Sequence, residues 1–163
     1  MMKMTADALA QFMVKSEMAT PDQIQGFSEE EIVLLEKKHG VNLPESYKDF
    51  LISFGKTDDA VFYSIYFTYP SLDRSRHHAY ELAAANGLTL PPGAFIFLME
   101  DSLFLFFNTE EGKDPPVYKY IEGQTIQKYA DSFSQWLSDM VQAEVALDVE
   151  NKKHPGIIYH GEK

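Results

Sequence analysis

The chain has 163 residues, of which 45% are hydrophobic, 13% are aromatic and none is cysteine. This length fits one domain that buries roughly two-thirds of its unfolded surface, and the lack of cysteine excludes disulfides, thiolate catalysis and cysteine-bound zinc. Acidic residues outnumber basic ones by 25 to 14, a formal net charge of -11, so the surface repels nucleic acid and anionic lipid.

The sequence contains no segment typical of export or membrane insertion. Its start, MMKMTADALAQFMVK, has one early lysine but no sustained apolar stretch behind it. The most apolar runs, AFIFLM and LFLFF, are far shorter than the roughly 18 residues that a membrane helix needs. We therefore expect a soluble, cytoplasmic protein without a membrane partner.

The first part of the chain predicts two helices before residue 41. Leu9, Phe12 and Met13 indicate a short amphipathic helix within residues 1–15. Ser28 and Glu31 have the spacing of a capping box, and Gly40 supplies a left-handed stop. A second helix is therefore expected between Ser28 and Gly40.

The next stretch, HGVNLPESYKDFLISFGK, predicts a tight corner and a third helix. Pro44 suits the first helical position, where its missing N–H would have no partner in any case. Four apolar residues then fall at i, i+3, i+4 and i+7 on one face: Tyr47, Phe50, Leu51 and Phe54. Two short helices should thus meet at a corner and present apolar faces to a sheet.

Five segments predict strands of that sheet. VFYSIYFTYP (61–70) alternates in polarity and ends at a proline. AFIFLMED and LFLFFNT lie on either side of a turn at Asp101 and Ser102, which favours a hairpin. PPVYKYIEG predicts a further strand and QTIQKYA a short one, while SRHHAYELAAANG predicts a helix after the first strand, ended by Asn86 and Gly87.

The last expected helix begins at Asp131 or Ser132 and runs to about residue 149. Its buried stripe is expected at Phe133, Trp136, Leu137, Met140 and Val141. The polar tail that follows contains three apolar candidates for an extra edge segment, Ile157, Ile158 and Tyr159.

The order of elements predicts the fold class. Helices and strands are grouped rather than strictly alternating, which is typical of an α+β domain. We expect a single domain over residues 1–163, with a core at about 24–142 between a short N-terminal helix and a polar tail. Its mostly antiparallel or mixed sheet should be flanked by N-terminal, central and C-terminal helices.

The titratable side chains do not form a recognisable catalytic pattern. Adjacent His77 and His78 point about 100 degrees apart on a helix, which disfavours a shared metal, and His39 is interpreted as a cation at a helix C-terminus. The acidic pairs at 100–101 and 110–111 lie at opposite ends of a strand, roughly 20–30 Å apart, whereas a glycosidase pair needs under about 10 Å.

Sequence motifs for other chemistries are also absent. The chain has no GxSxG nucleophile elbow, no HExxH and no glycine-rich phosphate loop. The Tyr-Lys-Tyr pattern at 118–120 is more typical of cross-strand packing than of nucleic-acid binding. We therefore expect no enzymatic activity, no cofactor, no metal and no nucleic-acid partner.

The two-helix corner resembles the signature of the SUKH superfamily, the SMI/KNR-type domain. The matching residues are Glu36, Gly40, Leu43, Pro44, Tyr47, Phe50 and Leu51. Segments further along are similar to the family's later strands and to its closing helix, where the matching residues are Phe133, Trp136 and Leu137. The resemblance covers about residues 24–142, and it departs from the family pattern at FGK and at EDSLFLFFNT.

The resemblance implies a binding module. Bacterial members of the superfamily are widely seen as immunity proteins that bind and neutralise a toxin, often a nuclease or a deaminase. Fungal relatives regulate cell-wall assembly and signalling. Two hypotheses follow, an immunity protein and a regulatory interaction domain without a toxin, while an enzyme would require a polar pocket with converging titratable groups.

The charge supports a basic protein partner, because a toxin that grips nucleic acid is itself basic and an acidic inhibitor would be steered towards it. Exposed acids and one aromatic on expected loops are the candidate contact residues: Asp58, Asp59, Tyr66, Glu100, Asp101, Glu110 and Glu111. Each of these acids also fits a simpler interpretation, in which it only solvates a turn.

Overall fold

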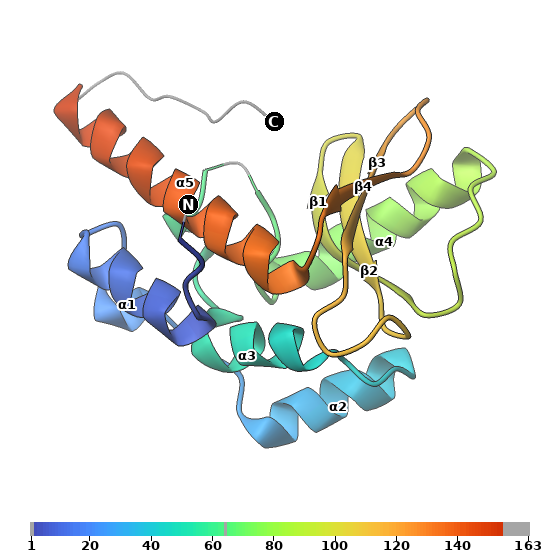
Figure 1. Cartoon of the computed structure of the whole chain (residues 1–163), viewed down its shortest axis with the longest axis horizontal. Coiled ribbons are helices and arrows are strands. Elements are labelled where there is room, and N and C mark those ends of the chain that lie inside the picture. The colour runs from blue at the N-terminus through green and yellow to red at the C-terminus, as the bar shows by residue number, and fades with distance from the viewer. Residues whose placement is uncertain (1, 64, 155–163) are drawn as a thin grey trace.

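A computed structural model describes residues 2–63 and 65–154 (Figure 1). The elements in chain order are α1 (Ala6–Lys15), η1 (Pro21–Gln23), α2 (Glu29–His39), α3 (Glu45–Phe54), η2 (Asp59–Val61), α4 (Ser71–Ala85), β1 (Ala94–Glu100), β2 (Leu103–Asn108), β3 (Val117–Ile121), β4 (Gln127–Ala130) and α5 (Phe133–Lys153). The strands form one antiparallel sheet in the order β1-β2-β3-β4. The predicted α+β class is confirmed, while the expected edge segment at 157–159 lies outside the described residues.

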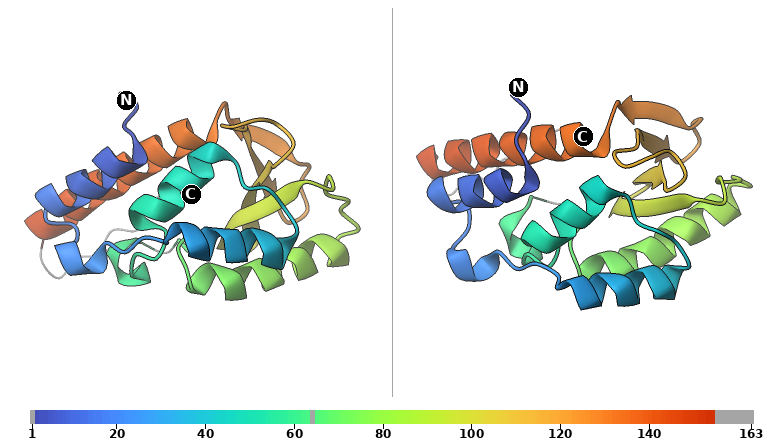
Figure 2. Two further views of the ribbon diagram at one scale, coloured as in Figure 1. Left: turned by 90° about the horizontal axis from the view of Figure 1, so that it is seen from below. Right: turned by 60° about the horizontal axis from the view of Figure 1, so that its bottom comes forward.

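Helices cover both faces of the sheet. On one face, Phe95, Leu105 and Phe107 belong to a core shared with α1, α2, α3 and α5. On the other face, Phe104 and Phe106 pack with alanines of α4. Figure 1 shows α4 behind the strands, and both views of Figure 2 place α2 alongside α4. The alternation of strand side chains therefore builds two apolar layers.

The predicted corner between the first two core helices is confirmed. Ser28 and Glu31 form the reciprocal capping box, and Gly40 closes α2 in the left-handed conformation with φ 63°. Pro44 lies one residue earlier than predicted: it is the N-cap of α3, with ψ 149°, and the helix begins at Glu45. The physical reason is that the extended backbone of the corner persists through Pro44 before the helix starts.

The aromatic face of α3 forms the centre of the larger core. Tyr47 is fully buried and its ring lies 5.1 Å from Phe107 and 5.3 Å from Phe133. Phe50, Leu51 and Phe54 are also fully buried. The predicted inward stripe thus joins the sheet to α5.

The strand predicted at 61–70 is wrong. Val61 ends η2, and the single strand-type pairing among the described residues of this segment is an isolated bridge between Tyr66 and Met99. The Tyr66 carbonyl accepts from the Met99 amide, but other hydrogen bonds of the segment go elsewhere: the Tyr69 amide donates to the Gly55 carbonyl and the Thr68 hydroxyl to Asp59. The described part of the segment bends at Phe62, Tyr63 and Thr68 and touches the sheet at β1 through Tyr66.

The remaining strands and helices follow the sequence closely. The hairpin turns at Asp101 and Ser102, with Glu100 opposite Leu103, and β3 and β4 lie where they were predicted. The central helix α4 ends before Asn86, and Gly87 has φ 64°. Helix α5 extends to Lys153, four residues further than predicted, since its last turn carries Lys152 and Lys153 beside the helix carbonyl ends.

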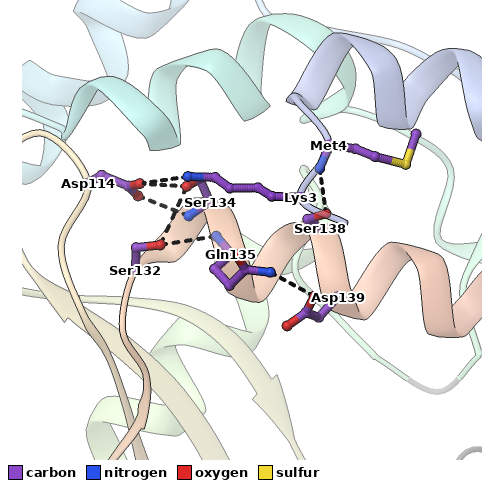
Figure 3. A network of polar contacts seen from close by, with 8 residues as sticks. All are labelled: Lys3, Met4, Asp114, Ser132, Ser134, Gln135, Ser138 and Asp139. Carbon is purple, nitrogen blue, oxygen red and sulfur yellow. Dashed lines mark hydrogen bonds and ion pairs between the residues drawn. The ribbon is translucent and has the colours of Figure 1, made fainter. Parts of the chain in front are cut away.

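Polar contacts fix the start of α5 against two distant segments (Figure 3). The Ser132 hydroxyl accepts from the Gln135 backbone N–H, but the Gln135 side chain donates to Asp139, so Ser132 and Gln135 do not form a reciprocal capping box. Asp114 accepts from the Ser134 amide at 2.9 Å, and Ser138 accepts from the Met4 amide at 2.8 Å.

These contacts also shift a carboxyl pKa. Burial acts to raise the pKa of Asp114, but hydrogen bonds from the Ser134 hydroxyl and amide outweigh it, so the pKa lies below its usual value. The ammonium group of Lys3 lies 3.7 Å from the same carboxylate. The N-terminal segment, the β2–β3 loop and α5 are therefore held as one unit.

Candidate partner-binding groove

A groove of about 940 Å³ runs between α5 and the sheet. The sheet contributes Leu98 from β1, Leu105 from β2 and Lys119 from β3. The helix contributes a side that faces away from α1 and α3, beginning at Trp136. Figure 1 shows that α5 continues past the end of the sheet.

Two adjacent apolar stripes on α5 explain this arrangement. The first stripe is buried in the core and includes Phe133, Leu137, Val141 and Val145. The second stripe lies beside the first on the helix surface and lines the groove. Its residues have the spacing i, i+4, i+7 and i+11: Trp136, Met140, Ala143 and Leu147. The predicted burial of Trp136 is confirmed, but Met140 is only half-buried because it forms part of the groove wall.

The groove carries a strongly negative lining. Its charged side chains are four carboxylates and one ammonium group: Glu100, Asp139, Glu144, Glu150 and Lys119. The ammonium of Lys119 lies 4.6 Å from the centre of the Tyr129 ring, so this cation is engaged by an aromatic face within the site. An apolar floor below acidic side chains matches a ligand that is both apolar and positively charged.

Exposed aromatic side chains accompany the groove. Tyr129 lines it and is 52% exposed, and Tyr66, which follows the lining residue Ile65, is 46% exposed. Tyrosine and tryptophan side chains are enriched at protein interfaces because they bring large contact area with few rotatable bonds. The groove therefore has the composition of a docking surface.

Within residues 2–63 and 65–154, no three side chains of the metal-binding types gather into one group. In the same part of the chain no helix is long and apolar enough to cross a membrane. Besides Lys119 and Tyr129, the groove lining consists of carboxylates and apolar side chains.

The residues of the two-helix signature lie at the corner between α2 and α3. There the Glu36 side chain connects the two helices. One of its carboxylate oxygens accepts from the Leu43 amide at 2.7 Å and lies 3.6 Å from the Lys48 ammonium. Leu43 and Tyr47 are buried beside it. A glutamate one turn before the left-handed Gly40 can reach across the corner, which gives the spacing a physical reason.

Comparison with known protein families agrees with this corner. The profile of the SMI1 / KNR4 family (SUKH-1) matches residues 26–139. The chain belongs to this family. A search of the curated proteins finds no match. The match to the SUKH-1 family runs from the segment before α2 to the first turns of α5, so the groove residues Met140, Ala143 and Leu147 lie beyond it.

The SUKH-1 fold divides the predicted contact residues among three places. Glu100 lines the groove, and Asp101 follows it in the hairpin turn with φ 46°. Tyr66 bridges to Met99, next to Glu100. These three residues lie together at one end of the sheet.

The other predicted acids lie elsewhere. Asp58 caps η2 through the Ala60 amide, and Asp59 accepts from the Thr68 and Ser71 hydroxyls, so both carboxylates serve local structure. Glu110 and Glu111 follow the opposite end of β2, and Glu111 accepts from the Tyr118 hydroxyl at 3.0 Å.

The histidines differ from one another. His77 and His78 are exposed on α4, and ring nitrogens of both lie within 4 Å of Glu81. The interpretation of His39 as a helix cation is wrong. Burial lowers its pKa to about 4, and the positive charges of Arg76 and Lys38 act in the same direction, so the ring is neutral at pH 7.

Sequence reasoning missed the outer wall of the groove. The signal was present, because the apolar positions of the last helix continue past Val141 at Ala143, Val145 and Leu147. Together these positions cover a wider part of the helix surface than contact with one core requires. It indicates a helix with two apolar surfaces, one of them uncovered.

Proposed function

We propose that this SUKH-1 protein is a non-enzymatic immunity protein that neutralises a toxin of the nuclease or deaminase type by direct binding. The observation that carries the proposal is the groove between α5 and the sheet, which combines an apolar floor with four carboxylates. A toxin domain that holds nucleic acid presents basic residues on its own active face. Such a face complements this groove in charge and in apolar surface.

The net negative charge and the apolar lining of the groove would affect different steps of binding. A net charge of -11 accelerates encounter with a basic partner, and the effect falls with added salt. Apolar contacts with Trp136 and Leu147 would then set the dissociation rate. A partner segment with lysines or arginines beside leucine or aromatic residues fits this site.

The test is binding to toxin domains encoded next to this gene, measured by calorimetry and by inhibition of toxin activity. We expect the double variant Asp139→Lys/Glu150→Lys to weaken binding about 100-fold, or about 2.7 kcal/mol, because two rim charges become repulsive. Both side chains are exposed, so the variant should fold.

A matched control distinguishes the groove from the other predicted acids. The variant Glu110→Lys/Glu111→Lys makes the same change in net charge at the opposite end of β2 and should leave most of the affinity intact. Equal weakening by both variants would mean that charge steers the partner without a defined groove. If no neighbouring toxin domain binds at micromolar concentration, the toxin proposal fails and the alternative, a regulatory interaction domain of the SMI/KNR type, takes its place.

A further inference from the structure

A second hollow, of about 700 Å³, lies between the end of α2, the outer side of α4 and the segment before β1. Its wall contains Arg76, whose side chain comes from the middle of α4 and is only 5% exposed. A buried guanidinium is rare in proteins unless it is paired with an acid. This hollow will be called the Arg76 pocket.

The hydrogen bonds of Arg76 leave part of its donor capacity unused. Its Nε donates to the Ile96 carbonyl at 2.7 Å and its Nη2 to the Tyr80 hydroxyl at 3.2 Å. Its Nη1 lies 3.0 and 3.1 Å from the two ring nitrogens of His39, of which only one is an acceptor in the neutral ring. Three of the five N–H groups are thus engaged and two remain.

Within the described residues, no carboxylate forms an ion pair with Arg76. The acid nearest in sequence that lines the pocket, Asp73, is paired with Lys38 at 3.4 Å. The guanidinium lies 4.1 Å from the Phe95 ring centre and 5.5 Å from that of Tyr80. Aromatic faces offset part of the desolvation cost but do not neutralise the charge.

We propose that the Arg76 pocket binds a small oxyanion, a phosphate or a carboxylate on an apolar body, which accepts from the free N–H groups of Arg76. The ammonium group of Lys38 also lines the pocket; it is paired with Asp73 in the unliganded chain and can turn to the anion. The rest of the lining includes Leu88, Leu90 and Pro91, which can receive the apolar body. Bidentate recognition of such groups is the strongest interaction that a guanidinium makes.

The ligand is a small molecule rather than a macromolecule. The volume lies within the range of roughly 300–1,000 Å³ that is typical of small-molecule sites. The net charge of -11 would repel a polyanion or an acidic protein strongly. It would repel a small anion much less, because a small anion has only one or two charges. The pocket therefore adds a ligand site to the proposed binding function and does not depend on it.

The experiment is a titration of the isotope-labelled protein with inorganic phosphate, phenyl phosphate and benzoate at constant ionic strength, followed by NMR. We expect saturable shifts of the Arg76 Nε–H signal and of the amides at residues 88–90 and 93–95. Phenyl phosphate should bind 3- to 10-fold more tightly than inorganic phosphate because of its apolar ring. The absence of saturable shifts with all three probes at 50-fold excess over the protein and about 20 mM ligand would overturn the proposal.

Two pairs of variants separate binding from structure, since Arg76→Met can fail to fold. Lys38→Gln should weaken phenyl phosphate binding at least 3-fold, whereas Lys37→Gln, the exposed neighbour outside the pocket, should leave it unchanged. Ala84→Trp, at an exposed position that lines the pocket, should block binding, and Ala85→Trp should not. Equal binding within either pair would show that Arg76 only ties α4 to β1.

Discussion

The groove beside α5 and the Arg76 pocket differ in the origin of their charge. The groove carries carboxylates at its surface, in keeping with the net charge of the chain. The pocket contains a buried cation that the net charge does not anticipate. The difference teaches that composition describes the exposed rims of a protein, while a buried site depends on which side chains the helices bring together.

The two sites also depend on different helices, so they can be disturbed separately. The pocket uses the end of α2, whose position is set by the corner at Glu36. The groove uses α5, whose start is fixed by Asp114, Ser132 and Ser138. Each variant below should therefore affect one site more than the other.

The largest effect is expected at the corner. Glu36→Ala removes the acceptor of the Leu43 amide and leaves that buried N–H without a partner. The free energy of unfolding should fall by about 2–3 kcal/mol, the cost of losing a hydrogen bond to a charged group. Urea denaturation measures this loss, and NMR titration should show weaker phosphate binding in the Arg76 pocket with the groove signals unchanged.

Glu36→Gln is the matched control, because its amide oxygen can still accept from Leu43. It should cost about 1 kcal/mol, from the lost ion pair with Lys48, which is partly exposed. If glutamine and alanine were equally harmful, the ion pair rather than the hydrogen bond would hold the corner.

A medium effect should distinguish the two stripes of α5. Val141→Ala removes two methyl groups from the fully buried stripe and should cost about 2 kcal/mol. Leu147→Ala, on the half-buried groove stripe, removes more carbon but should cost less than about 1 kcal/mol, because solvent already reaches it. Thermal or urea unfolding of both variants measures the difference.

The same pair should behave in the opposite way in partner binding. Leu147→Ala should weaken binding in the groove, while Val141→Ala should leave it nearly unchanged once the protein is folded. A cost for Leu147→Ala as large as that for Val141→Ala would indicate that the second stripe is packed in the core and that the groove is closed.

Local signals allowed much of the fold to be predicted. The α2–α3 corner depends on a capping box, a left-handed glycine and a proline, which act within a few residues. The hairpin at 101–102 likewise depends on neighbouring segments. The segment 61–70 has the composition of a strand, but the hydrogen bonds of Tyr69 and Thr68 go to α3 and η2, a tertiary outcome that local pattern does not determine.

The sites were less accessible to sequence reasoning. Glu100 was identified as a contact residue from its charge and its place on an expected loop, and it lines the groove. Asp139 was on a helix regarded as core, and Glu150 lay just past the predicted end of that helix. Arg76 lies in SRHHAYELAAANG, which reads as an exposed polar helix. Its burial requires α2 and the edge of β1 to pack on α4, which only the three-dimensional structure shows.

The smallest effect is a pH dependence that belongs to the pocket and not to the groove. Because burial lowers the pKa of His39 to about 4, the unfolded chain binds more protons than the folded one between about pH 6.5 and pH 4. Stability should therefore fall as pH decreases through this window, by about 1 kcal/mol after allowance for partial exposure of the ring. His39→Gln should remove this part of the decline in urea denaturation between pH 7 and about pH 5.5.

The exposed His77 provides the control, since His77→Gln should leave the decline unchanged. The range above pH 5.5 separates His39 from carboxyl groups such as Asp114, whose lowered pKa places its contribution at more acidic pH. The charges that face His39 are Arg76 and Lys38, which oppose its protonation, and Asp73, which favours it. A decline of the same size in His39→Gln would mean that His39 has the same pKa in the folded and unfolded chain, so that the pocket does not oppose its protonation and other groups cause the decline.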